Sequence, residues 1–137
     1  MPVASDPHAY DYAIVRVVPR VDRGERINAG IIVSCATQRY LAATIAFDAA
    51  RLVALDATVD PGEVEAALAT IPLIAAGDVR GGPIALLPRG ERFHWLVAPH
   101  SAMIQTSRVH SGLGDDLDAA RAQLVKRLVD PLPTRPR

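Results

Sequence analysis

Apolar residues along the chain recur with two periods, one typical of strands and one typical of helices. Five short runs have the composition of strands. Glycine and proline after the first run predict a long-looped hairpin, and a short turn follows the second run, so the first three runs are expected to form a three-stranded antiparallel meander. A further pair of runs lies in the last third of the chain. Runs rich in aromatic and β-branched residues, the composition typical of strands, occupy residues 10–18, 27–36, 40–47, 92–98 and 103–109.

The remaining apolar positions recur at helical spacing. Asp48, Asp60 and Asp115 each stand where a helix needs an N-cap, and Pro61 follows the second of them at the first helical position. We therefore expect a short helix, a longer helix and a last helix after these three residues. Residues 77–91 contain four glycines and two prolines, so they are predicted to form a loop.

This order of elements predicts one α+β domain. Strands that follow each other through short connections favour a mainly antiparallel sheet of about five strands, with the helices packed on one face. We assign residues 10–130 to the domain and expect flexible tails at residues 1–9 and 131–137.

Composition narrows the class of protein. The chain has 137 residues, half of them hydrophobic, and fifteen basic residues balance fifteen acidic ones, so the formal net charge is zero. Cys35 is the only cysteine, which excludes an internal disulfide. No apolar stretch is long enough to span a bilayer and the N-terminus lacks a signal pattern, so we expect a cytoplasmic protein that does not enter a membrane.

The zero net charge is unevenly distributed. Residues 16–39 hold five arginines and two carboxylates, residues 80–110 hold four arginines and one carboxylate, and residues 48–78 hold one arginine and six carboxylates. The strand-bearing regions are thus basic and the first helical region is acidic. Two interpretations stay open: an anion site held by arginine forks, or mutual neutralisation between layers. Six aromatic residues in all argue against nucleic acid as the partner.

Arg16 and the segment that follows it carry the first set of candidate site residues. Arg16 interrupts an apolar strand, so it needs either a carboxylate partner or a half-solvated face. In the arginine loop, residues 20–28, Arg20 and Arg23 could grip a phosphate-containing small molecule while Glu25 and Asn28 orient it. The same residues could equally form a turn with local ion pairs. The spacing matches no phosphate-binding loop.

A second polar strip lies towards the C-terminus. We take Arg92, Gln105, Ser107 and His110 as further candidates for anion or partner binding. His94 and His110 fall on or beside predicted neighbouring strands, so they are weak candidates for the ligands of a metal ion. Their spacing fits no zinc pattern, so we assign neither a metal nor another cofactor. Ser101, His110 and Asp115 supply the residue types of a Ser–His–Asp catalytic triad. The sequence around Ser101 lacks the nucleophile-elbow motif that such enzymes often carry.

Two blocks of the sequence, YDYAIVRVVPRVDRGERINAGII and ERFHWLVAPHSAMIQTSRVHSGL, carry a resemblance to a known family. They resemble a bacterial family catalogued as domain of unknown function 3037, and the resemblance extends over residues 10 to about 129. It implies no activity, but similar proteins are often encoded beside a kinase-like protein of the HipA type. The matching positions are Tyr12, Arg16, Pro19, Arg20, Gly24, Glu25, Asn28, Gly30, Phe93, Trp95, Pro99, Ser101, Gln105, Ser107, His110, Gly112 and Leu113.

These observations lead to three hypotheses. The first is a non-catalytic accessory or interaction module, for which a homodimer and a kinase-like partner protein are both left open. The second is an anion-, phosphate- or nucleotide-binding protein that uses the arginine loop. The third is a hydrolytic or metal-dependent enzyme. It ranks last because no group of residues in the sequence identifies a catalytic residue.

Overall fold

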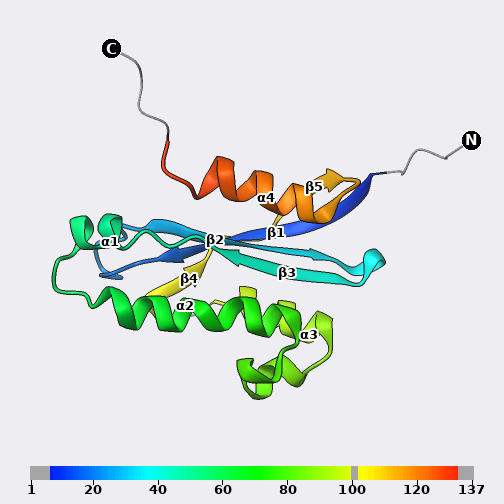
Figure 1. Ribbon diagram of the computed structural model, residues 1–137, viewed down its shortest axis with the longest axis horizontal. Helices are drawn as coiled ribbons and strands as arrows, with labels where there is room; N and C mark the ends of the chain where they lie inside the picture. The colour runs from blue at the N-terminus through cyan, green and yellow to red at the C-terminus, as the bar shows by residue number, and fades with distance from the viewer. Residues whose placement is uncertain (1–6, 100–101, 133–137) are drawn as a thin grey trace, which may run out of the picture.

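The computed structural model describes residues 7–99 and 102–132. Five antiparallel strands form one open sheet, and four α-helices and several 3₁₀ turns surround it (Figure 1). The strands are β1 (His8–Val17), β2 (Ile27–Cys35), β3 (Tyr40–Ile45), β4 (Ile104–Thr106) and β5 (His110–Gly114). The helices are α1 (Ala49–Leu55), α2 (Pro61–Ala76), α3 (Arg89–Val97) and α4 (Leu117–Leu128).

The sheet is organised around β1. Its order is β3-β2-β1-β4, and β5 also pairs with β1, so the predicted meander of the first three strands is confirmed. On the edge of β1 opposite β2, β4 pairs with residues 15–17 and β5 with residues 8–12. The predicted strand 103–109 is thus shorter, because Ser107 ends β4. The Ser107 amide donates to the Ile14 carbonyl at 2.8 Å, and its hydroxyl accepts from the Ile14 amide at 2.8 Å.

The strand predicted at residues 92–98 is wrong, because this segment belongs to helix α3. Its aromatic content is that of a strand, but its buried positions have helical spacing. Phe93 packs against the core and Leu96, three residues later, is buried within it. The loop predicted before it contains two 3₁₀ turns, η2 (Val79–Gly81) and η3 (Pro83–Leu86), and the first residues of α3.

The α+β class is confirmed, but the prediction that the helices share one face of the sheet is wrong. Helices α2 and α3 cover one face and α4 covers the other (Figure 1). The central strands are apolar on both faces, as strands between two layers must be. Val15 and Ile32 pack with α2, whereas Ile14 and Ile31 pack with α4.

A β-bulge in β2 sets which residues face each layer. Pairing with β1 runs from Val15 opposite Gly30 to Arg16 opposite Asn28, so Ala29 is the extra residue. A side chain at Gly30 would collide with β3, since its Cβ would lie 2.6 Å from the Thr44 carbonyl oxygen. A glycine inside a strand favours either a bulge or a close approach of another group, and the structure has both at this point. The extra residue shifts the alternation, which places Asn28 on the α4 face.

Candidate functional site

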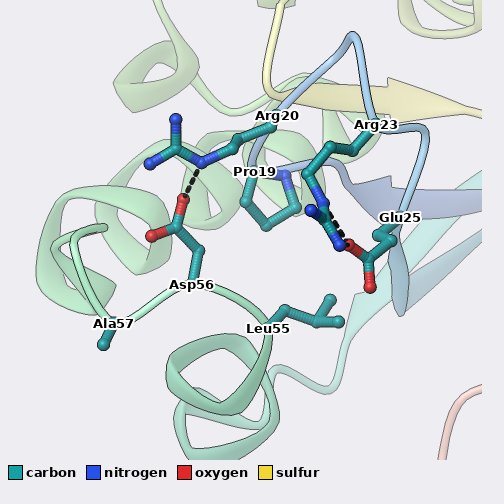
Figure 2. A pocket seen from close by; sticks show the side chains of 7 residues that line it. All are labelled: Pro19, Arg20, Arg23, Glu25, Leu55, Asp56 and Ala57. Atoms are coloured by element: carbon teal, nitrogen blue, oxygen red, sulfur yellow. Dashed lines mark hydrogen bonds and ion pairs between the residues drawn. The ribbon is translucent and has the colours of Figure 1, made fainter.

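The arginine loop borders a cavity of about 280 Å³ between the β1–β2 loop and the segment after α1. Figure 2 shows side chains from both segments around it. The loop supplies two arginines and a glutamate, and the other wall supplies one aspartate. The lining residues are Pro19, Arg20, Arg23, Glu25, Leu55, Asp56 and Ala57.

Arg20 is held by a carboxylate from the other wall. Its Nε lies 3.0 Å from Oδ2 of Asp56, whose side chain is only 8% exposed. The Thr58 amide and hydroxyl donate to Oδ1 of Asp56 at 2.9 and 2.5 Å. Hydrogen bonds from Thr58, first through its hydroxyl, lower the pKa of Asp56, and the charge of Arg20 lowers it further. Asp56 therefore holds its negative charge at neutral pH and neutralises Arg20.

Arg23 is paired within its own loop. Its guanidinium forms an exposed ion pair with Glu25 (Figure 2), and the intervening Gly24 adopts a left-handed φ of 71° that closes the turn. Glu25 thus pairs with a loop arginine rather than standing free to orient a ligand. Two guanidinium groups and two carboxylates share the cavity, so its local charge balances. Anion binding by Arg20 and Arg23 stays a prediction, and any anion there would have to compete with these carboxylates.

Asn28 has a structural contact with the C-terminal end of α4. Its Nδ2 donates to the Leu128 carbonyl at 2.8 Å, and Nη1 of Arg51 donates to the next carbonyl, that of Val129, at 3.1 Å. Carbonyls in the last turn of a helix lack partners within the helix, so these two side chains complete the end of α4.

Arg92 plays the same part at α2. Its Nη1 donates to the Ile74 and Ala75 carbonyls, at 3.1 and 2.8 Å, in the last turn of that helix. Because Arg92 lies on α3, the second polar strip predicted from the sequence is divided between two layers. Arg92 is on the α2 side of the sheet, whereas His110 is on the α4 side.

The other members of that strip are also engaged. Ser107 is 5% exposed, and its hydroxyl, which accepts from Ile14, donates to the Arg108 carbonyl at 2.8 Å. Gln105 lies opposite Arg16 in the sheet, and its amide donates to the Ala102 carbonyl at 3.0 Å. His110 stacks on Tyr12 with ring centroids 5.3 Å apart.

The structure does not bring the two candidate metal ligands together. His94 is exposed on α3 beneath one face of the sheet, and His110 stacks on Tyr12 at the other face. No cluster of three or more histidine, cysteine, aspartate or glutamate residues suited to a metal occurs within residues 7–99 and 102–132. Ser101, the proposed nucleophile of the triad, lies outside the described residues.

Arg16 differs from the other candidate arginines because its guanidinium makes no hydrogen bond or ion pair with another described residue, whereas Arg20, Arg23 and Arg92 each make at least one. It is half-buried in β1, and its Nε is buried without a hydrogen-bond partner among the residues that the structure describes. Burial lowers its pKa, and so does the charge of nearby Arg26. The expectation that Arg16 sits on a half-solvated face therefore fits better than pairing with a carboxylate.

Two features of the site were missed from the sequence. Asp56, the partner of Arg20, is 36 residues away, and only the Asp56-Ala57-Thr58 triplet, a typical side-chain-capped turn, marks it locally. The second is an apolar groove of about 230 Å³ between α2, α3 and β4, called the α2–α3 groove below. It depends on residues 92–98 being helical, which the sequence pattern did not predict.

A family model described as protein of unknown function (DUF3037) matches residues 12–129, which is most of the chain. The chain belongs to this family. The DUF3037 match covers every strand and helix described above apart from the first residues of β1. Neither a curated protein nor a solved structure matches the chain. Within the described part of this DUF3037 chain, every helix is too short or too polar to cross a membrane.

Proposed function

We propose that this protein is a non-catalytic interaction module that binds a protein partner through the α2–α3 groove. The observation that supports this most strongly is the apolar lining of the groove, which includes Ala67, Ile71, Trp95 and Ile104. Trp95 is 41% exposed although it is the largest apolar side chain of the protein. Tryptophans beside apolar grooves are typical anchors of protein–protein interfaces.

The apolar surface continues along α2. Ala66, Ala69 and Ala76 are exposed on this helix at positions where a surface helix normally carries charged residues. After Glu65 this helix carries no charged residue. Helix α2 packs against the sheet and α3, and a bound partner would cover the apolar surface that these contacts leave exposed.

The polar candidate residues support a binding role over a catalytic one. Arg92 and Asn28 complete helix ends, and Ser107 joins β1 to the end of β4. A general base or nucleophile must have its reactive atom available to a substrate. These side chains instead use their polar atoms in contacts that hold the layers together.

The chemistry of the partner follows from the charges beside the groove. Glu63 is exposed on α2 one helical turn before Ala67, and it forms no ion pair with another described residue. A complementary partner presents apolar side chains to the groove and basic side chains to this end of α2. A kinase-like protein of the HipA type, suggested by the family resemblance, is our candidate for the source of this surface.

Isothermal titration of the purified chain with a kinase-like protein of the HipA type from the same organism tests the proposal. Ala67→Glu places a carboxylate in the groove at an exposed helical position, so the fold should tolerate it. Leu113→Glu is the matched control, because it adds the same charge at a 71% exposed apolar residue on β5, outside the groove.

We expect Ala67→Glu to weaken binding at least about tenfold, which corresponds to about 1.4 kcal/mol, and Leu113→Glu to leave it unchanged. Equal loss of binding in both variants would show that the groove is not the contact surface. Absence of binding by the wild-type chain would refute this partner.

A further inference from the structure

Arg16 lies close to the edge of the layer formed by α4. It follows Tyr12 and Ile14 along the face of β1 that packs towards α4, but that helix lies over β2 and β3. Its strand neighbours on that face are Asn28 on β2 and Gln105 on β4, whose side-chain amides donate to other backbone carbonyls. A guanidinium only donates hydrogen bonds, and neither the side-chain oxygen of Asn28 nor that of Gln105 accepts one from Arg16.

A comparison with Arg121 shows how unusual this environment is. Burial lowers the pKa of both arginines. Arg121 compensates with an ion pair to Asp118, 2.9 Å away, and with a hydrogen bond to the Thr44 hydroxyl at 2.9 Å. Arg16 has no such contact among the described residues, and the charged group that perturbs it is the cation Arg26.

Two like charges beside a partly desolvated position destabilise the protein unless a counter-charge is supplied. Within residues 7–99 and 102–132 the four ion pairs use Arg20, Arg23, Arg80 and Arg121. No carboxylate of the described chain neutralises Arg16 or Arg26. The described residues therefore leave a net positive charge at this point, which an external anion can neutralise.

We infer that Arg16 and Arg26 form a binding site for a phosphate group, on the opposite face of the sheet from the α2–α3 groove. Arg26 is exposed and lies two residues before Asn28, the β2 residue opposite Arg16, so strand alternation places Arg26 on the same face as Arg16. The site is distinct from the cavity of the arginine loop, where each arginine already has a carboxylate.

Charge matching favours phosphate over a carboxylate. A phosphate ester carries about −1.5 to −2 charges at pH 7 and three acceptor oxygens, whereas a carboxylate carries one charge. A carboxylate would leave one of the two guanidinium charges uncompensated. Planar guanidinium groups also bind phosphate through pairs of parallel hydrogen bonds, which a single anion can accept from two arginines.

The test measures thermal unfolding and calorimetric binding of inorganic phosphate, with sodium chloride at the same ionic strength as the reference. Arg16→Met removes the charge and keeps a long apolar stem, and Arg26→Gln removes the second charge at an exposed position. Arg20→Gln is the matched control, because Arg20 is a neighbouring arginine already paired with Asp56. A nucleoside 5′-monophosphate provides a second ligand arm.

We expect phosphate to raise the unfolding temperature of the wild type and of Arg20→Gln, and Arg16→Met to raise the Kd at least about tenfold. Without phosphate, Arg16→Met should unfold at the same or a higher temperature than the wild type, since an uncompensated charge is removed. Tighter binding of the nucleotide would identify the phosphoryl group of a small molecule as the ligand, and equal or weaker binding would identify free phosphate.

Three results would overturn the inference. One is a wild type that gains nothing from phosphate over chloride. Another is an equal loss of phosphate binding in Arg20→Gln and Arg16→Met. If Arg16→Met does not fold, Arg26→Gln decides, because its exposed position spares the fold, and unchanged phosphate affinity in that variant would refute the site. None of these outcomes depends on the α2–α3 groove.

Discussion

Alanine at position 30 tests the close approach of β2 and β3 at the bulge. A Cβ on Gly30 would lie 2.6 Å from the Thr44 carbonyl oxygen and 2.7 Å from Cδ1 of Ile45. A close carbon–oxygen contact is about 3.3 Å, so the strands would have to separate by about 0.7 Å. The end of the Ile45 side chain can rotate away, but the Thr44 oxygen belongs to the backbone of a paired strand.

The magnitude follows from two opposing effects. Overpacking a tight site costs about 1–3 kcal/mol. Replacing glycine by alanine also restricts the unfolded chain, which returns about 0.4–1 kcal/mol where the new side chain fits. We therefore expect Gly30→Ala to lower the free energy of unfolding by roughly 1–2 kcal/mol.

Gly90→Ala is the matched control, because a Cβ at Gly90 in α3 would meet nothing within 4 Å. It should leave stability unchanged or raise it by up to about 1 kcal/mol. The two variants should therefore differ by about 1–3 kcal/mol, or on the order of 10 °C in Tm. Urea and thermal unfolding, followed by circular dichroism, measure both quantities. If Gly30→Ala proves as stable as Gly90→Ala, the close approach of β3 does not explain the glycine.

Three further predictions concern individual polar contacts. Hydrogen bonds from Arg80 lower the pKa of Asp78 from 3.8 to about 2, so the unfolded chain binds this proton more readily than the folded one. The Tm difference between the wild type and Asp78→Asn should therefore be full above about pH 4 and shrink as the pH falls towards 2; a difference constant across this range would contradict the reasoning. Arg92→Leu leaves two carbonyls at the end of α2 without their donor, which should cost roughly 1–3 kcal/mol in urea unfolding; an unchanged midpoint would show that solvent replaces Arg92. Asn28→Ala should cost about 1 kcal/mol and speed hydrogen exchange in the last turn of α4, while exchange in α2 stays as in the wild type.

The sequence predicts elements well where one local pattern decides them. Asp48 and Asp60 cap α1 and α2 as expected, and Pro61 stands at the first position of α2. The last helix is capped by Asp116, one residue after the predicted Asp115. These signals succeed because a cap satisfies backbone amides within three residues of itself, so the chemistry and the sequence distance are both short.

Predictions fail where contacts distant in the chain decide the outcome. The composition of residues 92–98 favours a strand, but packing against α2 and the sheet selects the helix. The Arg20–Asp56 pair joins the basic loop to the acidic segment after α1. The charges of the two segments left open whether these regions bind an anion or neutralise each other. In the Arg20–Asp56 pair, the basic side chain and the acidic side chain neutralise each other. No local pattern could choose a partner 36 residues away.

The position of α4 has a consequence for how the protein is made. Its buried residues Leu117 and Leu124 cover Tyr10, Ile31 and Val33, yet α4 comes after all five strands in the chain. While the chain emerges from the ribosome, one face of the growing sheet stays uncovered until this last helix is translated. A nascent or truncated chain that stops before Leu117 would expose β-branched residues on a paired sheet, a surface that invites aggregation. Synthesis must therefore reach the end of α4 before this face of the sheet is covered and protected from aggregation.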